Sequence, residues 1–221
     1  VVKTIRYEAG GVQVETEKET FRSDRAVMTL PLGVLKKGSV AFSPSLPPQK
    51  LQAIQTLGMG LLDKVFLRFP KAFWPKKPEV LGYISKTKGA WAEWLNIYHY
   101  TNQPILLAFN AGHFAEKLSE LSDKAIVQSA MATLQRSFGP KIPQPEAYRV
   151  TRWGKDPFAL GSYSFMAPGC DKKTIDALAV PVGERLFFAG EATSRDYPST
   201  IHGAFLSGLR ASAEVNKSAN K

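Results

Sequence analysis

The chain has 221 residues, 44% of them hydrophobic, and a formal net charge of +10. This length can bury the core of one large or two small domains. A single cysteine excludes a disulfide framework and a cysteine-rich metal site, and the three histidines lie too far apart for a zinc site, so no metal is expected.

No apolar run approaches the length of a membrane span, and no secretory signal opens the sequence. We therefore expect an intracellular protein, in the cytoplasm or in an organelle that the sequence does not specify.

The basic charge makes a nucleic-acid-binding or scaffold module one alternative. Such modules usually collect their Lys and Arg residues on one face or in a run. Here the longest runs are pairs, such as Lys36-Lys37 and Lys172-Lys173, dispersed over the chain. This dispersion favours a small-ligand role over nucleic-acid binding.

The N-terminal part predicts strands and one short helix. Residues 3–7 and 12–16 alternate apolar and polar side chains around a glycine-containing turn, which predicts a hairpin. Residues 25–30 predict a strand that Pro31 ends. A short helix is predicted after the proline-rich residues 43–50.

The middle of the chain predicts further strands. Residues 62–69, LDKVFLRF, alternate cleanly and place Lys64 on the face opposite Val65. Two more strands are predicted at residues 91–98 and 104–110.

The clearest helix is predicted over residues 122–139. Ser122 or Asp123 can cap its start, apolar residues recur on one face, and Gly139 ends it. A strand at residues 147–153 is expected next, followed by an irregular segment around GSYSFM.

The last elements are a strand, RLFFAG, and a helix that begins near Thr200. Between them lies Glu191. A helix N-terminus favours negative charge, and a carboxylate beside it can accept hydrogen bonds from sugar hydroxyls. The simpler interpretation is that Glu191 only caps the turn. In the helix, we expect one face rich in small residues to pack closely on a sheet; it consists of Ile201, Ala204, Phe205, Gly208, Ser212 and Val215. Strands outnumber helices, which indicates a mixed α/β and α+β fold.

Four stretches, in chain order, resemble the flavin-containing amine oxidase family. MTLPLGVLKKGSVAFSPSLPPQK resembles the strand and linker that leave its FAD-binding domain, and MGLLDKVFLRFPKAFWP resembles its lysine-bearing strand. TRWGKDPFALGSYSF resembles the segment that lines the flavin, and FAGEATSRDYPSTIHGAFLSG resembles the C-terminal FAD-binding signature. The resemblance covers nearly the whole chain and is nearest to the polyamine oxidase and lysine-specific histone demethylase branch.

The resemblance implies part of a two-domain fold. Residues 1–60 and 172–221 would belong to an incomplete, Rossmann-like FAD-binding domain, and residues 61–171 to a mixed-sheet substrate-binding domain flanked by helices. The family's G-x-G-x-x-G turn, with its acidic residue further on, does not occur in this sequence. We therefore expect the C-terminal portion of a longer enzyme, which needs an N-terminal portion to hold FAD tightly.

Five cofactor-binding residues follow from the resemblance. Val2 would contact the adenine through its backbone, and Trp153 would pack beside the isoalloxazine ring. Glu191 would bind the ribityl or ribose hydroxyls, and Thr200 and Ile201 would lie over the ring system.

Two catalytic residues also follow from it. Lys64 matches the family lysine that holds a water against flavin N5, and Tyr163 matches one wall of an aromatic cage whose other wall falls on Thr200. Ser162 stands where the monoamine oxidases carry the cysteine that links FAD, so non-covalent FAD is expected. Without the resemblance, Lys64 would be an ordinary solvent-facing lysine, and Tyr163 a core aromatic.

The implied reaction is oxidation of a C–H bond next to nitrogen. The resulting imine would be hydrolysed to an aldehyde and an amine, with O2 reduced to H2O2. The expected partners are O2 and a polyamine-type or other primary or secondary amine. The alternative within flavin enzymes is an FAD oxidase or desaturase that acts on a carbon substrate, such as a porphyrinogen or carotenoid. The lysine strand and the GSYS segment favour amines.

Overall fold

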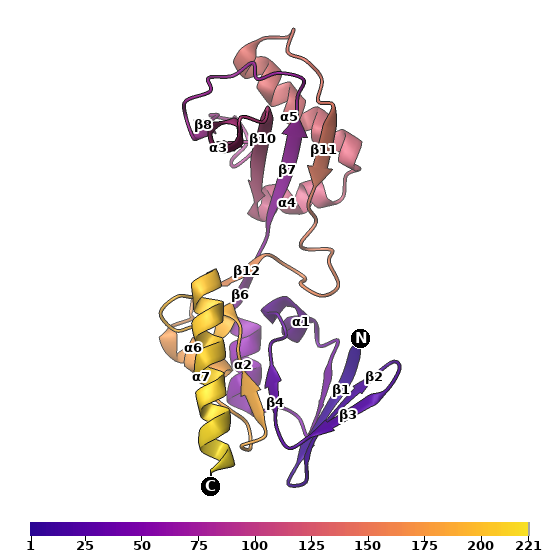
Figure 1. Ribbon diagram of the computed structural model, residues 1–221, viewed down its shortest axis with the longest axis vertical. Helices are drawn as coiled ribbons and strands as arrows, with labels where there is room; N and C mark the ends of the chain where they lie inside the picture. Colours follow the sequence, from indigo (N-terminus) through magenta and orange to yellow (C-terminus); the bar gives the residue numbers. More distant parts are fainter. Residues whose placement is uncertain (221) are drawn as a thin grey trace. The chain divides into compact units, whose positions relative to one another are not determined.

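The computed structural model describes residues 1–220, and these residues form two compact units. Unit 1 comprises Val1–Gly60 and the chain from Pro157 onward, and unit 2 comprises Leu61–Asp156; Figure 1 draws both. We expected residues 157–171 to belong with the middle of the chain. They pack with unit 1 instead, because the strand that they contain pairs with residues just before Leu61.

Unit 1 holds a four-stranded sheet, two strand pairs and most of the short helices. Its elements are β1 (Val2–Glu8), β2 (Gly11–Thr16), β3 (Thr20–Ser23), β4 (Ala26–Met28), α1 (Leu32–Lys37), β5 (Ala41–Ser43), α2 (Pro48–Thr56), β6 (Gly58–Gly60), β12 (Tyr163–Phe165), α6 (Lys172–Ala179), β13 (Leu186–Phe188), the 3-10 helix η1 (Glu191–Thr193) and α7 (Ile201–Ala219).

The larger sheet of unit 1 has the strand order β3-β2-β1-β5. The predicted hairpin is confirmed: β1 and β2 are antiparallel, with Ile5 opposite Val14. Ile5 and Val12 turn inward and pack with Leu32 and Leu186 in one core. The sheet therefore contributes one apolar face to the core and leaves a polar face outside.

The second part of unit 1 places α7 against β13, which runs parallel to β4. The face of α7 that is buried consists of Gly203, Ser207, Ala211 and Ser218. Our expectation that a face with Ile201 and Phe205 packs on a sheet is wrong for this chain, because both side chains are exposed, by 91% and 66%. Small residues are the ones buried because the helix lies close to the strand and to the loop before it.

Unit 2 is a five-stranded antiparallel sheet with helices. Its elements are β7 (Leu62–Arg68), β8 (Val80–Gly82), β9 (Glu93–Asn96), α3 (Tyr98–Thr101), β10 (Ile105–Ala111), α4 (Gly112–Ser119), α5 (Asp123–Phe138) and β11 (Ala147–Val150), and the strand order is β11-β7-β10-β9-β8.

The predicted alternation of β7 is confirmed. Val65 and Leu67 are fully buried and pack with Ile126 and Leu134 of α5, which lies along the sheet (Figure 1). The predicted cap of α5 is also confirmed, because the Ser122 side chain accepts a hydrogen bond from the amide of Ala125.

Two predicted segments differ in the structure. The strand expected at residues 91–98 is confined to β9, because Trp91 adopts a positive φ of 50° and the chain turns into α3 at Tyr98. The segment around GSYSFM, expected to be irregular, forms β12, which pairs with the glycine-flanked β6. No helix among residues 1–220 is both long and apolar enough to cross a membrane.

Candidate functional site

The sequence-predicted residues lie in two groups, one in each unit. Unit 1 holds Glu191, Tyr163, Thr200 and Ile201 near the start of α7, and unit 2 holds Lys64 and Trp153. Val2, the remaining residue, lies on β1 opposite Thr16 and takes no part in the hydrogen bonds described below.

Glu191 is the centre of the group in unit 1. It follows Gly190, whose φ of +125° turns the chain out of β13 into η1. Its Oε1 accepts a hydrogen bond of 2.9 Å from the backbone amide of Ser164, and its Oε2 accepts bonds of 2.6 Å from Ser164 Oγ and 2.7 Å from the amide of Ser199. The Ser199 hydroxyl donates back to the carbonyl of Ser164. The half-buried carboxylate thus joins β12 to the loop that precedes α7.

The start of α7 is held by its own side chains. Thr200 is the N-cap: its Oγ1 accepts from the amide of Gly203 at 3.0 Å and donates to the carbonyl of Tyr197 at 2.7 Å. A Cβ built on Gly203 would overlap that same carbonyl oxygen, so glycine is required here. Ile201, the first residue of the helix, therefore projects outward from a rigid turn.

The strand before Glu191 is fastened to α7 as well. The amide of Gly190 donates to Ser207 Oγ at 2.8 Å, and Arg210 Nη2 donates to the carbonyl of Phe188 at 2.7 Å. Arg210 also reaches Thr193 Oγ1 at 3.0 Å. These bonds fix the position of the Glu191 turn relative to the helix N-terminus.

These residues fit the part of FAD that the sequence comparison assigns to them. A carboxylate offers about four acceptor positions, so three hydrogen bonds leave about one for a sugar or ribityl hydroxyl. A 19-residue helix carries partial positive charge at its N-terminus, and Ile201 at that end is 91% exposed. A group that presents hydroxyls and gains negative charge on reduction suits this turn.

Lys64 lies in unit 2 on β7, opposite Phe109 of β10. It is half-buried, and its Nζ donates to the carbonyl of Leu62 at 2.8 Å. Burial lowers the pKa of Lys64 below its ordinary value, while the neighbouring Asp63 carboxylate acts to raise it. The amine of Lys64 is therefore easier to deprotonate than that of an exposed lysine.

Trp153 belongs to the same group through its backbone. Its amide donates to Asp63 Oδ1 at 2.9 Å, and its side chain is 41% exposed. The same oxygen accepts a bond of 2.9 Å from Thr151 Oγ1, and Thr151 Oγ1 accepts one of 2.8 Å from the amide of Lys64. A chain of hydrogen bonds thus connects the backbones of Lys64 and Trp153.

Sequence reasoning did not identify Asp63, Thr151, Ser164 or Ser199. Asp63 could have been identified, because the alternation of LDKVFLRF puts it on the apolar face with Val65. A carboxylate on a buried face needs hydrogen-bond partners. The two serines carry no comparable signal, because short polar side chains in such segments are common.

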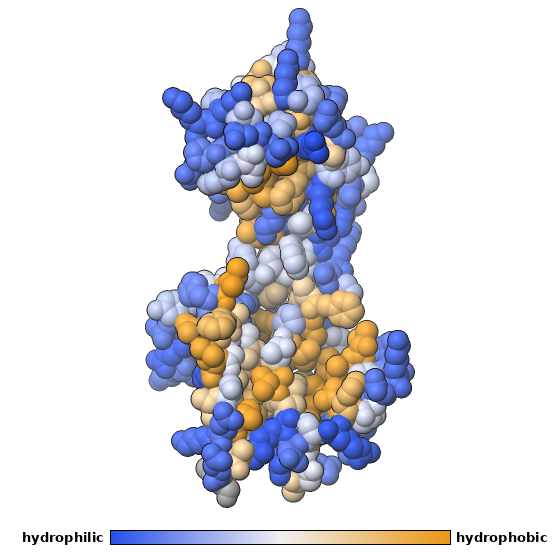
Figure 2. Space-filling model, viewed as in Figure 1, coloured by the Kyte–Doolittle hydropathy of each residue, from blue (hydrophilic) through white to orange (hydrophobic). Residues whose placement is uncertain are grey.

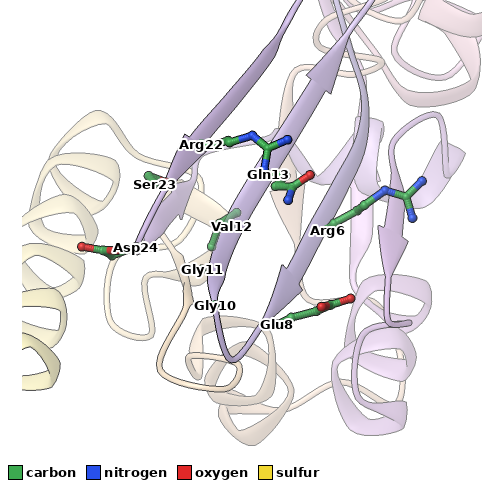
Figure 3. A pocket seen from close by; sticks show the side chains of 9 residues that line it. All are labelled: Arg6, Glu8, Gly10, Gly11, Val12, Gln13, Arg22, Ser23 and Asp24. Atoms are coloured by element: carbon green, nitrogen blue, oxygen red, sulfur yellow. The ribbon is translucent and has the colours of Figure 1, made fainter.

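A hollow on the outer face of the larger sheet of unit 1 is a separate feature (Figure 3). It has a volume of about 380 Å³ and is lined by Arg6, Glu8, Gly10, Gly11, Val12, Gln13, Arg22, Ser23 and Asp24. Gln13 and Arg22 lie opposite each other on neighbouring strands, and Arg6 is paired with Glu15 at 2.7 Å. The hollow lacks the apolar walls usual for a small-molecule site, and none of the predicted residues lines it.

The comparisons with known proteins define the class. The family model described as flavin containing amine oxidoreductase matches residues 1–216. The chain therefore belongs to this family of flavoprotein oxidoreductases, whose cofactor is FAD.

Individual relatives are consistent with this family. The chain is 43% identical to "Lysine-specific histone demethylase 1 homolog 1" of Oryza sativa subsp. japonica, over 100% of this chain and 27% of that protein. It is 42% identical to "Polyamine oxidase 2" of Arabidopsis thaliana, over 97% of this chain and 43% of that protein. The chain thus spans less than half the length of these relatives.

Solved structures of the family share the fold. Wild-type putrescine oxidase bound to putrescine matches with a TM-score of 0.82 at 22% identity, over 98% of this chain and 48% of that one. The mixed fold predicted from the sequence is confirmed as the fold of FAD-dependent amine oxidases.

Proposed function

We propose that the complete protein oxidises an amine at the carbon next to nitrogen, forming an imine that water hydrolyses to an aldehyde and an amine. FAD, when bound, accepts the electrons of the C–H bond and passes them to O2, which becomes H2O2. The observation that carries the proposal is the half-buried Lys64 on β7, in a chain whose family is the flavin amine oxidoreductases.

Six of the seven predicted residues have a stated part in this proposal. Glu191 holds the ribityl or ribose hydroxyls with its remaining acceptor position, and Thr200 and Ile201 lie over the ring system. Lys64, with its lowered pKa, holds a water at its Nζ and moves protons there. Trp153 packs beside the isoalloxazine ring. Tyr163 supplies an aromatic wall, and an apolar environment there disfavours an ammonium and so keeps the substrate amine neutral.

The exposed face of α7 in unit 1 would be covered by a further portion of the complete protein. Ile201, Phe205 and Leu209 are 91%, 66% and 55% exposed and recur every four residues, so they form one apolar stripe along α7. Figure 2 shows apolar side chains gathered along this helix. An apolar stripe of this kind usually has a cover. We propose that the N-terminal portion with the G-x-G-x-x-G turn supplies the cover and completes the FAD site.

Anaerobic mixing of the complete protein with amines tests the proposal. Spermidine and a peptide with a dimethylated lysine are the two informative probes, because the named relatives divide between polyamine oxidases and histone demethylases. Bleaching of the flavin absorbance by one of them, followed by H2O2 formation on admission of air, is the expected result. A flavin that no amine bleaches would contradict the proposal and favour a non-amine substrate.

A further inference from the structure

A small cavity with both polar and apolar lining residues lies in unit 2 beside the backbone of Lys64. Its volume is about 10 Å³, and it is lined by Asp63, Val65, Asn110, Ala115, Leu118, Ser119, Ile126, Val150, Thr151 and Arg152. Asn110 stands directly opposite Asp63, on β10 against β7, and is 1% exposed. Its Oδ1 is buried and has no hydrogen-bond partner among residues 1–220.

An unpaired amide oxygen of this kind is rare inside native proteins. Buried waters occupy polar cavities where they find two to four partners, and a cavity near 10 Å³ is about the smallest that holds one. A water here can donate one hydrogen to Asn110 Oδ1 and the other to the Asp63 carboxylate, which lines the same cavity. A cation is disfavoured, because the guanidinium-bearing Arg152 also lines it.

We propose that this cavity binds a single internal water, and that the hydrated cluster of Asp63, Asn110 and Thr151 positions Lys64. The catalytic role of Lys64 rests on the proposed function above, whereas the proposal of a water site does not depend on it.

The cluster reaches Lys64 through both of its backbone groups. Thr151 Oγ1 accepts from the amide of Lys64 at 2.8 Å, and the amide of Thr151 donates to the carbonyl of Lys64 at 3.0 Å. The Thr151 hydroxyl in turn donates to Asp63 Oδ1 at 2.9 Å. Because β11 ends at Val150, these bonds continue the pairing of the sheet past the end of the strand.

Arg152 keeps this segment in place from the other side of the cavity. Its guanidinium donates to the carbonyls of Ser119 and Leu121, each at 2.8 Å, and to Asp123 Oδ1 at 2.5 Å. With these acceptors engaged, the guanidinium is held away from Asn110 Oδ1. A water is then the donor that suits this amide oxygen.

A crystal structure of the complete protein that resolves ordered waters tests the water site. We expect one peak within hydrogen-bond distance of both Asn110 Oδ1 and the Asp63 carboxylate, and no such peak in Asn110→Leu, a variant of similar shape. An empty cavity in the wild type, or a protein donor bonded directly to Asn110 Oδ1, would overturn the water site.

Two substitutions of Thr151 test the positioning role. Thr151→Val removes the hydroxyl while keeping the shape, and we expect amine-driven flavin reduction to slow roughly tenfold, because a displaced catalytic group loses that much or more. Thr151→Ser keeps the hydroxyl and is expected to stay within about twofold of the wild type. Equal rates for Val and Ser would overturn the positioning role.

A readout independent of turnover separates this inference from the proposed function. The pH dependence of Lys64 acetylation by acetic anhydride, followed by mass spectrometry, reports the pKa of that amine. In Asp63→Asn we expect this pKa to fall, since the lost carboxylate charge is adjacent, and an unchanged pKa would contradict the cluster. If both the water peak and the shift appear while no amine reduces the flavin, the cluster stands and the amine oxidase proposal fails.

Discussion

The carboxylate of Glu191 and the residue Ser164 share two hydrogen bonds, of 2.9 Å from the Ser164 amide and 2.6 Å from its hydroxyl, across a separation of 27 residues. Together with the bond from Ser199, they make Glu191 the link between β12 and the loop before α7. The carboxylate therefore has a structural part in addition to the cofactor contact that we propose, because these bonds are formed by the protein alone.

Replacing Glu191 should affect stability and flavin binding together. Glu191→Ala leaves three donors without an acceptor, and we expect the free energy of unfolding of the flavin-free protein to fall by about 1–3 kcal/mol. Glu191→Gln keeps one side-chain oxygen and should lose less. Urea unfolding measures the stability and fluorescence titration measures the FAD affinity; an alanine variant as stable as the wild type would show that the bonds contribute nothing.

Two glycines of α7 form a matched pair for a second prediction. A Cβ at Gly203 would overlap the carbonyl oxygen of Tyr197, whereas a Cβ at Gly208 meets nothing within 4 Å. We expect Gly203→Ala to destabilise the protein by about 1–3 kcal/mol through overpacking, and Gly208→Ala to stabilise it by up to about 1 kcal/mol through helix propensity.

Thermal or urea unfolding of both variants measures these two changes in stability. If Gly203→Ala is tolerated, the N-terminus of α7 is less tightly held than the structure shows. A loss of stability in Gly208→Ala would indicate that another part of the complete protein covers this face of the helix.

The pattern of α7 shows which features the sequence could predict and which it could not. The start at Thr200 follows from local capping chemistry, and so does the start of α5 at Ser122. We expected a face rich in small residues, but one that also carries Ile201 and Phe205. The buried side is another face of small residues, which includes Gly203, Ser207 and Ala211. The exposed stripe is the more informative outcome, because it marks a surface that this chain by itself does not bury.

The site shows the same division between local and distant information. Alternation along β7 predicts where Lys64 points, because a strand repeats every two residues. The bond between Thr151 and Asp63 spans 88 residues, and the bond between Ser199 and Ser164 spans 35. No local pattern encodes such pairs, since they depend on how β11 and β12 are placed by the rest of each unit.

Lys50 gives a prediction of pH-dependent stability. The residue is only 2% exposed. Its Nζ donates to the carbonyl of Leu178 at 2.6 Å and lies 3.8 Å from the centroid of the Phe188 ring. Burial, and secondarily the charge of Arg210, lower the pKa of Lys50 from 10.5 to about 7. Between these values the unfolded chain binds more protons than the folded one, so this lysine makes stability rise with pH, by at most about 1.4 kcal/mol per pH unit.

Urea unfolding at several pH values from 7 to 10 measures this slope. In Lys50→Met the contribution should vanish, whereas Lys37→Met, which removes an exposed lysine of α1, should leave the slope as in the wild type. Below about pH 7 both states of Lys50 carry the proton, and its contribution to the slope ends. Parallel profiles for the wild type and Lys50→Met would refute the assignment.

The mode of cofactor attachment is tested by acid precipitation. From the family resemblance we expect Ser162 to stand where a cysteine links FAD in the monoamine oxidases, and a hydroxyl does not form that thioether. We expect all of the flavin absorbance of the complete protein in the supernatant after acid treatment. Flavin retained in the pellet would reveal a covalent link at another residue, with Cys170, the one cysteine of the chain, as the first to examine.

Lys64 provides the direct test of the chemistry. Lys64→Met keeps the length of the side chain and removes the amine, so FAD should remain bound while flavin reduction or reoxidation slows by about two orders of magnitude or more, as expected on losing a group that moves protons. Stopped-flow absorbance separates the two half-reactions. Lys71→Met, at an exposed lysine beyond the end of β7, is the control and should keep normal rates. Near-normal turnover in Lys64→Met would remove the Lys64 amine from the mechanism and leave it with a structural part, its bond to the Leu62 carbonyl.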